Sequence, residues 1–468
     1  MSRLIMVSNR VPLPDAQGNP PAGGLAVALS AALQQHQGIW MGWSGMVSEH
    51  GHKVPLRSHQ DGAIQYALFD LSQRDIDEYY AGFANRMLWP LCHYRIDLVD
   101  YARQDMRGYF RVNRLFAEKL APLIKPGDKI WVHDYHLIPL ASELRQRGID
   151  NPIGFFLHIP WPPADIFFTL PVHEIILRGL AAYDLVGFQT DYDVENFTHC
   201  LIREGVGKQQ EGGQFFAYNH LFRAAAFPIS IDTDNFAKMA RKAVHYPSLM
   251  RLKNSLLERD LIVGVDRLDY SKGILHRLDA YERFLGRYKT SCERVSFLQI
   301  TPKSRSDVPE YAQMQQKVAS IAGRINGDYG NIDWTPIRYV NRSFSQEVLG
   351  GLYRVARVGL VTPLRDGMNL VAKEYIAAQD PENPGVLILS RFAGAARELT
   401  NALLVNPYDG DGVSHALAQA LSMALPERQE RWQAMMQQLR DHTITHWCTQ
   451  FLQNLQKSEE DYKIPSDF

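Results

Sequence analysis

Cysteine is scarce in this chain, and the few cysteines present lie far apart. The 468 residues include only four, Cys92, Cys200, Cys292 and Cys448. None of them forms a CxxC pair or has the Cys and His spacing of a zinc site. We therefore expect reduced thiols, most of them in the core.

A long apolar run is also missing. The run Leu4 to Val7 is followed at once by Ser8 and is too short for the apolar region of a signal peptide. No window approaches the ~18 apolar residues of a transmembrane helix. We expect a cytoplasmic protein with no membrane partner.

The chain has almost no net charge. Its 50 Lys and Arg residues balance 51 Asp and Glu residues, for a formal charge of -1. No global field would therefore attract DNA or RNA. Nucleic acid is not an expected partner, and any anion site must be local.

Hydrophobic residues are plentiful by contrast, at 46% of the chain. Short apolar runs alternate with amphipathic stretches of helical spacing, and the length suits two large domains or three small ones. The runs occupy residues 3–8, 129–133, 153–158, 184–189, 261–265, 295–300, 357–362 and 385–390, and the helical stretches include 135–147, 275–287, 308–322, 346–355 and 369–379. This alternation predicts a doubly wound α/β fold.

The clearest domain boundary lies at residues 224–236, where a strand-like run ends in Pro228 and a helix begins after Asp232. We divide the chain into an N-terminal α/β domain at 1–230 and a C-terminal one at 231–445. A final helix at 446–468 has Trp447, Phe451 and Leu455 on one face, and it could pack back on either domain.

Two cations follow the apolar run 261–265. Arg267 and Lys272 bracket a loop, and Gly273 stands where a helix begins. Cations beside a helix N-terminus suit a phosphate, because free N–H groups and the helix dipole add to their field. The spacing is not that of a Walker A loop, and an ordinary solvated loop with two surface cations remains the alternative.

A second candidate loop follows the run 357–362. Asp366 and Gly367 lead into a helix whose first N–H groups, from Met368 to Val371, would point toward a diphosphate. Asp366 and Glu374 could both accept hydrogen bonds from sugar hydroxyls. An Asp-Gly loop before an ordinary helix is the alternative.

The N-terminal half has polar residues at similar positions. Gly23 and Gly24 precede an apolar helix and would let a backbone approach a ligand closely. Asp134 and His158 follow neighbouring runs and could meet, although a helix cap and a core histidine are the simpler interpretations. Further cations follow strands at Arg10 and Arg305.

With these residues assembled, the chain resembles the trehalose-6-phosphate synthase family, which comprises retaining, UDP-glucose-dependent GT-B glycosyltransferases. The matching motifs cover nearly the whole chain and include RLIMVSNR, AGGLAVAL, GWSG, LWP, WVHDYHL, GFFLHIP, GFQT, RLDYSKG, AGRING, VTPLRDGMNLVAKEY and FAGAARELTNALLVNPYD. The resemblance implies a GT-B fold, with two Rossmann-like domains facing a central cleft. The N-terminal domain would bind the acceptor and the C-terminal one the nucleotide sugar.

The resemblance also implies roles for particular residues. In the catalytic group, Arg267 and Lys272 would hold the donor diphosphate, and His158 and Asp134 would line the transferring sugar and its acceptor. Donor-binding residues would be Gly23, Gly24, Phe344 beside the uracil, Asp366 at the glucosyl hydroxyls, Gly367, Met368, Asn369, Leu370, Val371 and Glu374 at the ribose. Acceptor-binding residues would be Arg10 and Arg305 at the phosphate, Tyr80, Trp43, Trp89 and Asp134.

The implied reaction transfers glucose from UDP-glucose to glucose 6-phosphate with retention, giving trehalose 6-phosphate and UDP. Neither a metal nor another cofactor is expected. The expected assembly is a homo-oligomer, a dimer or tetramer, and a trehalose-6-phosphate phosphatase would be the pathway partner.

Several alternatives stay open. The same fold could glucosylate another phosphorylated acceptor such as glycerol 3-phosphate, or it could be a catalytically silent sugar-phosphate sensor. An NAD-type oxidoreductase is disfavoured because no strand is followed by GxGxxG. Asp-x-Asp triplets that could hold a metal occur at Asp75/Asp77, Asp191/Asp193, Asp232/Asp234 and Asp409/Asp411. Only Asp232 and Asp234 follow a strand-like run, and helix capping explains that pair equally well.

Overall fold

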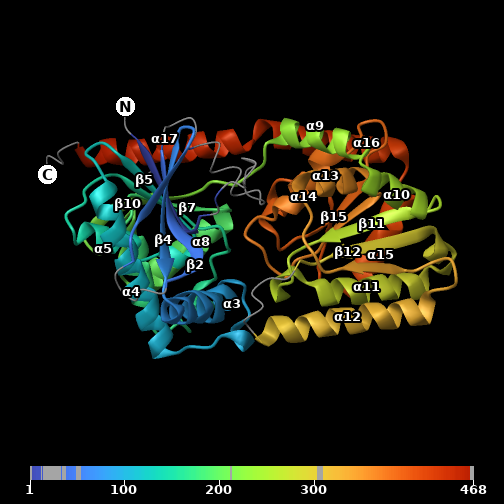
Figure 1. The fold of residues 1–468 in the computed structure, drawn as a ribbon, viewed down its shortest axis with the longest axis horizontal. Helices are drawn as coiled ribbons and strands as arrows, with labels where there is room; N and C mark the ends of the chain where they lie inside the picture. Colours follow the sequence, from blue (N-terminus) through green and yellow to red (C-terminus); the bar gives the residue numbers. More distant parts are fainter. Residues whose placement is uncertain are drawn as a thin grey trace. The chain divides into compact units, whose positions relative to one another are not determined.

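The computed structural model describes residues 3–11, 13, 33, 38–48, 54–210, 213–302 and 309–463. The chain divides into two compact units (Figure 1). The first comprises Met1–Pro228 with Thr445–Phe468, and the second comprises Ile229–Ile444. Gly23, Gly24 and Arg305 lie outside the described residues.

The first unit is built on a ten-stranded sheet in the order β3-β4-β2-β1-β5-β6-β7-β10-β9-β8. The strands from β4 to β10 in this order run parallel, whereas β3, β9 and β8 join antiparallel at the edges. The strands are β1 (Leu4–Arg10), β2 (Ile39–Val47), β3 (Arg57–Asp61), β4 (Ile64–Leu71), β5 (Lys129–His133), β6 (Ile153–Phe156), β7 (Leu185–Phe188), β8 (Gly207–Gln209), β9 (Gln214–Ala217) and β10 (His220–Ala226).

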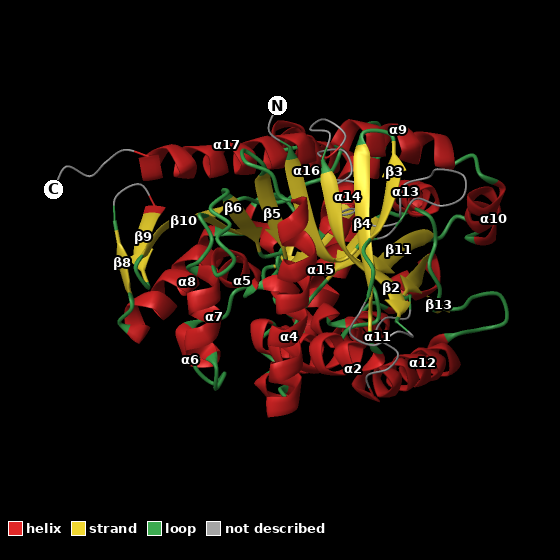
Figure 2. Ribbon diagram, turned by 60° about the vertical axis from the view of Figure 1, so that its left-hand side comes forward, coloured by secondary structure: helices red, strands yellow, loops and turns green. Residues whose placement is uncertain are grey.

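Helices and short helical turns connect these strands (Figure 2). They are α2 (Gln73–Asp75), the π-helical η1 (Ile76–Leu88), α3 (Trp89–Cys92), η2 (Ile96–Leu98), α4 (Arg103–Leu120), η3 (Ala121–Leu123), η4 (Tyr135–Leu137), α5 (Leu140–Arg145), α6 (Ala164–Phe167), α7 (His173–Leu180) and α8 (Asp191–Glu204). The last helix, α17 (Ile444–Lys463), belongs to this unit from Thr445 onward. Its Phe451 ring stacks on Trp131 of β5 at 4.3 Å between centroids.

The second unit has a six-stranded, fully parallel sheet in the order β13-β12-β11-β14-β15-β16. Its strands are β11 (Asp260–Val265), β12 (Val295–Ile300), β13 (Ile337–Val340), β14 (Val358–Val361), β15 (Val386–Ser390) and β16 (Leu403–Val405). Its helices are α9 (Thr233–Ala243), α10 (Pro247–Ser255), η6 (Tyr270–Lys272), α11 (Ile274–Arg287), η7 (Lys289–Arg294), α12 (Pro309–Tyr329), α13 (Gln346–Val355), α14 (Leu370–Ala378), η8 (Gly394–Arg397), α15 (Gly410–Ser422) and α16 (Leu425–Asp441).

All eight predicted apolar runs form strands, so the α/β prediction is confirmed. Their side chains are buried on both faces, as in β6 and β14, because helices cover a parallel sheet on both sides. One predicted helix is wrong in detail: residues 135–147 form the turn η4 and, after a break at Pro139, the short helix α5. Proline lacks an N–H donor, which favours a new helix start there.

The structure also describes the cysteines and the apolar character of the helices. Cys92, Cys200 and Cys448 are free and buried, so the prediction of reduced core thiols is confirmed for these three. Within the described part of the chain, no helix has the length and apolar character needed to span a membrane.

Candidate active site

Lys272 lies in a tight loop after strand β11 of the second unit. Buried Asp269 begins the turn η6 and its Oδ1 accepts a hydrogen bond from the Ser271 N–H at 2.9 Å. Gly273 follows with φ at +65°, and a Cβ there would stand 2.3 Å from the carbonyl oxygen of Thr362. Only glycine fits this left-handed position without strain. The loop therefore turns sharply into helix α11 and presents Lys272 at the carboxyl edge of the sheet.

Lys272 and Asp366 form an ion pair, although their positions are 94 residues apart. The Lys272 Nζ lies 2.5 Å from Asp366 Oδ2, and Asn369 Nδ2 donates to the same oxygen at 3.0 Å. The loops meet because β11 and β14 are neighbouring strands. The structure thus brings the two predicted loops together at one point of the sheet edge.

Asn369 caps helix α14. Its backbone is left-handed, with φ at +82°, and its Oδ1 accepts from the Ala372 N–H at 3.2 Å. The helix begins at Leu370, one residue later than predicted. The N–H groups of Leu370 and Val371 belong to the first turn, which has no earlier helical carbonyls to bond to. This helix start has the chemistry of an anion site.

Two further contacts fix the loop that contains Gly367 and Met368. The Ala395 N–H donates to the Met368 carbonyl at 2.8 Å. A Cβ on Gly394 would lie 1.9 Å from the Gly367 oxygen, so the turn η8 packs backbone against backbone on this loop. The turn η8 therefore holds this loop through its backbone.

The buried side chain of Arg277 in α11 supports the loop that contains Lys272. Its guanidinium is fully buried and lies 2.7 Å from Asp266 Oδ2. It also donates to the Thr362 hydroxyl at 3.0 Å and to the Lys272 carbonyl at 3.3 Å. One side chain thus joins the ends of β11 and β14 to the lysine backbone.

Glu374 lies in the body of α14 and is 8% exposed. Burial raises its carboxyl pKa to about 7, although Gln346 Nε2 lies 3.5 Å from its Oε1. The same carboxyl can therefore be neutral or charged near neutral pH. Phe344 is half-buried in the loop after β13, and the Arg342 guanidinium lies 4.9 Å from its ring centroid.

Arg267 is more open than Lys272. Its side chain is 42% exposed, and its Nε lies 3.5 Å from Asp269 Oδ2. Asp269 therefore orients both ends of the loop, through its bond to Ser271 and its pairing with Arg267. The alternative of a solvated loop with surface cations therefore describes Arg267 better than it describes Lys272.

In the first unit, Asp134 contacts the backbone of His158, whereas the predicted meeting was between the carboxylate and the imidazole. The Asp134 Oδ1 accepts from the backbone N–H of His158 at 3.2 Å. Asp134 stands at the N-cap position of η4, as the helix-cap alternative expects, but its side chain makes no capping hydrogen bond. Its backbone is left-handed, with φ at +75°, which is uncommon outside glycine and is found at functional sites.

Aromatic rings gather near the end of β1. The Arg10 guanidinium lies 6.0 Å from the Trp43 ring centroid, and Trp43 lies 5.8 Å from Tyr80. Tyr80 in turn stacks on His136 at 5.8 Å. Trp89 is only 4% exposed and packs on His93, so it contributes more to the core than to an open wall.

The structure also places four residues without a predicted site role beside these side chains. They are His133, His136, Arg277 and Trp447. His133 and His136 lie in the HDYH segment that also contains Asp134, and this clustering was the available signal. Nothing in the sequence ties Arg277 or Trp447 to a site, because their contacts depend on the fold.

The Asp-x-Asp triplets have structural roles. Asp232 caps α9, Asp409 caps α15 and Asp193 forms a capping box with Thr190, and Asp75 pairs with Arg111 at 2.6 Å. The capping alternative for Asp232 is confirmed. Among the described residues, no group of three or more His, Cys, Asp or Glu side chains gathers closely enough to hold a metal ion.

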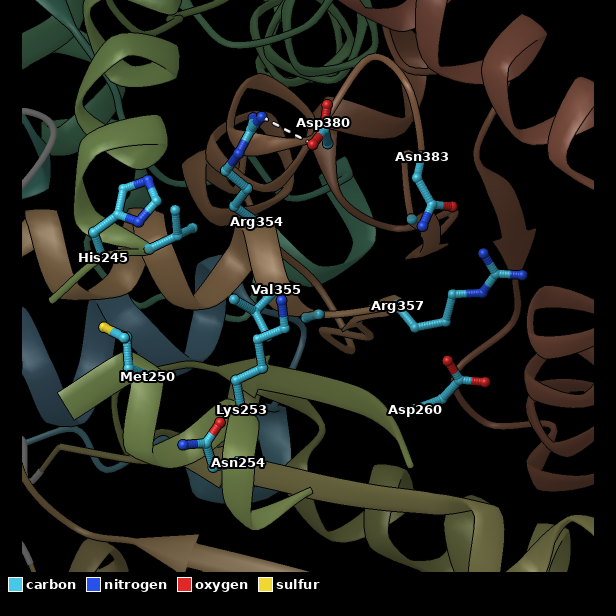
Figure 3. Close-up of a pocket in the computed structure, with 13 residues that line it drawn as sticks. His245, Met250, Lys253, Asn254, Asp260, Arg354, Val355, Arg357, Asp380 and Asn383 are labelled. Atoms are coloured by element: carbon cyan, nitrogen blue, oxygen red, sulfur yellow. Dashed lines mark ion pairs between the residues drawn. The ribbon is translucent and has the colours of Figure 1, made fainter. Parts of the chain in front are cut away.

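A cavity of about 630 Å³ lies at the opposite, amino-terminal edge of the second sheet (Figure 3). Its lining includes Asp260 at the start of β11 and Arg357 just before β14. Arg354 points toward Asp380, 3.2 Å away, and it also donates to two carbonyls at the end of α14. Arg357 likewise donates to carbonyls at the end of α15, and helix C-termini attract such positive charges. Because it lies at the opposite edge of the sheet, the cavity is not part of the candidate site.

Known proteins match the chain along almost its whole length. The model of "Glycosyltransferase family 20" matches residues 2–457. A trehalose-6-phosphate synthase of Sinorhizobium fredii is 60% identical over 461 residues, covering 98% of this chain and 99% of that protein.

Solved structures agree with this. An α,α-trehalose-phosphate synthase (UDP-forming) of Burkholderia xenovorans in complex with glucose-6-phosphate is 47% identical, with a TM-score of 0.94, covering 97% of this chain and 100% of that one. A structure described as trehalose-6-phosphate from E. coli bound with UDP-2-fluoro glucose is 47% identical, with a TM-score of 0.92, covering 97% and 99%. The chain belongs to glycosyltransferase family 20.

Proposed function

We propose that this chain transfers the glucosyl group of UDP-glucose to the C1 hydroxyl of glucose 6-phosphate, giving α,α-trehalose 6-phosphate and UDP. The observation that carries the proposal is the meeting of Lys272, Asp366 and the start of α14 at one sheet edge. A cation, a carboxylate and free N–H groups together suit a sugar diphosphate. A relative named trehalose-6-phosphate synthase is 60% identical over 98% of this chain, which supports the proposal.

The second unit binds the donor in this proposal. Lys272 and Arg267 hold the diphosphate together with the N–H groups of Leu370 and Val371. Asp366 accepts from the glucosyl hydroxyls and Glu374 from the ribose, while Phe344 lies beside the uracil. Gly367, Met368 and Asn369 supply the backbone between these contacts, and Gly23 and Gly24 approach the donor.

The first unit binds the acceptor. Arg10, together with Arg305, holds the 6-phosphate, and Tyr80 and Trp43 surround the sugar. His158 and Asp134 lie next to the transferring glucose and its acceptor. The open position of Arg10 at the end of β1, beside the Trp43 ring, supports the phosphate role.

In the reaction, the acceptor oxygen forms a bond to C1 of the donor glucose as the bond from C1 to the UDP oxygen breaks. UDP-glucose is an α-glucoside and the product is α-linked, so configuration is retained. We propose attack on the same face, with the hydroxyl proton passing to the leaving phosphate. Lys272 and Arg267 then stabilise the charge that develops on UDP. No metal ion is required in this scheme.

Product analysis tests the proposal. The protein is incubated with UDP-glucose and glucose 6-phosphate, glycerol 3-phosphate or free glucose, and UDP release and the glycoside formed are measured by NMR. Trehalose 6-phosphate from the first mixture alone is the expected result. A glucoside of glycerol 3-phosphate would replace the acceptor assignment, and binding of both sugars without UDP release would indicate a sensor.

Three finer points are also proposals. The protein acts in the cytoplasm. It works as a dimer or tetramer, which light scattering after gel filtration measures. Its product is consumed by a trehalose-6-phosphate phosphatase, which a coupled phosphate-release assay detects.

A further inference from the structure

A buried histidine lies directly behind His158. His133 ends strand β5, is 1% exposed and pairs in register with Phe156 of β6. Its Nδ1 lies 3.1 Å from Nε2 of His158, a normal hydrogen-bond distance. The two rings are 5.4 Å apart between centroids and inclined by 27°.

Large rings enclose this pair and hold it in place. Trp131 lies 4.7 Å from the His133 ring, and Phe156 lies 4.7 Å from the His158 ring. Trp447 of α17 is 6.4 Å from His133, and its Nε1 donates to the Phe227 carbonyl at 3.0 Å. In these surroundings both imidazoles are neutral: burial lowers the pKa of His158 to about 3 and that of His133 well below its usual value.

The donor and acceptor of the hydrogen bond between the two rings follow from the surroundings of Nε2 of His133. A neutral imidazole has one N–H, so only one of the two rings donates. The Nε2 of His133 is buried and has no hydrogen-bond partner among the described residues. A proton on Nε2 would leave a buried N–H unpaired, which native structures rarely tolerate. With the proton on Nδ1, that nitrogen donates to His158 and only a lone pair stays unpaired.

We propose that His133 is a positioning residue that donates its Nδ1–H to Nε2 of His158 and thereby fixes His158 as the tautomer protonated on Nδ1. The bond made by one imidazole nitrogen sets the state of the other. His158 then offers an N–H donor, and not a base, to a sugar oxygen. The use of this donor in glucosyl transfer rests on the proposed function, whereas the tautomer itself does not.

The tautomer can be measured directly in the ligand-free full chain. Selective ¹⁵N labelling of the 16 histidines separates protonated from bare ring nitrogens by chemical shift. Spectra of His133→Phe and His158→Gln assign the two signals by their absence. The expected result is a protonated Nδ1 and a bare Nε2 on both residues. A protonated Nε2 on His158 would overturn the proposal.

Substitutions test the positioning role. His133→Phe keeps a buried ring and removes the donor, whereas His133→Asn keeps an amide N–H near the place of Nδ1. We expect His133→Phe to lower kcat about 10- to 100-fold, the range seen for lost supporting bonds, with a nearly unchanged KM for glucose 6-phosphate. His133→Asn should retain most of kcat, and its His158 should keep a protonated Nδ1.

Trp131→Phe is the matched packing control, because Trp131 touches the His133 ring and makes no hydrogen bond to His158 among the described residues. It should leave kcat close to that of the wild type. The positioning role would be overturned if kcat fell equally in His133→Asn and His133→Phe, or if a folded His133→Phe kept full activity. If the wild type transfers no glucose, the proposed function fails, and the spectra still decide the tautomer.

Discussion

The ammonium of Lys272 lies 2.5 Å from Oδ2 of Asp366, with only 12% and 14% of the two side chains exposed. Each charge therefore holds the other at the edge of the second sheet before any substrate is bound. In the proposed reaction, a diphosphate that takes up Lys272 would compete with this carboxylate, and the glucosyl hydroxyls would then become the partners of Asp366. On that proposal the ion pair would link diphosphate binding to sugar binding.

Lys272→Ala should nearly abolish turnover. The variant loses the cation on the leaving group, worth ~2 to 4 kcal/mol or roughly a factor of 30 to 1,000 in kcat. It also removes the positive charge beside the Asp366 carboxylate, which then keeps only neutral hydrogen-bond donors such as Asn369. Steady-state kinetics measure the loss, and Lys253→Ala, which changes an exposed lysine at the opposite sheet edge, serves as the control.

The ion pair between Lys272 and Asp366 predicts that a second substitution partly restores UDP binding. Removing the uncompensated charge in Lys272→Ala/Asp366→Asn should restore part of the UDP affinity that Lys272→Ala loses, as measured by calorimetry. A double variant no better than Lys272→Ala would mean that the two side chains do not interact during binding.

The sequence was most informative where burial is complete. The apolar runs of β5, β6, β11 and β15 are buried on both faces and were readily predicted. Strand β3, RSHQD, is fully exposed at the sheet edge and has no apolar signal. An edge strand exists because a neighbour pairs with it, which its own residues do not record.

The same limit applies to the candidate site. Sequence position placed Lys272 and Asp366 at strand ends, and the order of strands in the sheet brought them together. The bonds from Arg277 to Thr362 and from His133 to His158 join residues 85 and 25 positions apart. Such pairs depend on register and side-chain packing, which no local pattern encodes.

The raised carboxyl pKa of Glu374 predicts that the stability of the protein depends on pH. Its folded pKa is about 7 against an ordinary value of 4.5, so the folded state holds a proton that the unfolded chain has lost between these pH values. Stability therefore falls as pH rises through this window. Glu374→Gln, which keeps an oxygen for Gln346, should flatten the decline in Tm between pH 5 and 8. Parallel Tm curves for variant and wild type would show that the carboxyl is already ionised.

Activity should persist after exhaustive dialysis against EDTA. Lys272, Arg267 and the first turn of α14 supply positive charge where a divalent ion would otherwise neutralise the diphosphate. The rate of UDP release before and after dialysis is the measurement. Loss of activity that manganese or magnesium restores would require a metal in the mechanism.

Gly273→Ala should damage the Lys272 loop. The new methyl would stand 2.3 Å from the Thr362 oxygen, and φ at +65° adds roughly 1 to 2 kcal/mol for any residue with a Cβ. Gly62→Ala is the matched control, since Gly62 has φ at +55° and open space around it. We expect Gly62→Ala to lose stability alone and Gly273→Ala to lose kcat as well. Equal kcat in the two variants would show that the loop tolerates the shift.

The last prediction concerns how α17 docks on the first sheet. The Phe451 ring is fully buried, and Cβ atoms on Gly154 and Gly187 of the adjacent strands β6 and β7 would stand 2.7 Å and 2.8 Å from it. The two strands are bare at these points because the ring occupies the space that side chains would fill. Gly154→Ala should therefore destabilise the protein by about 1 to 3 kcal/mol, the usual cost of overpacking.

Shortening the ring tests this directly. Phe451→Leu alone should also destabilise, because it removes the stacking on Trp131 and leaves a void. The double variant Gly154→Ala/Phe451→Leu should lose less than the sum of the two single losses, because the new methyl enters the space that the ring vacates. Urea unfolding measures all three. Strictly additive losses would mean that α17 shifts away from the sheet instead of packing through Phe451, and that Trp447 beside His133 is not held by this contact.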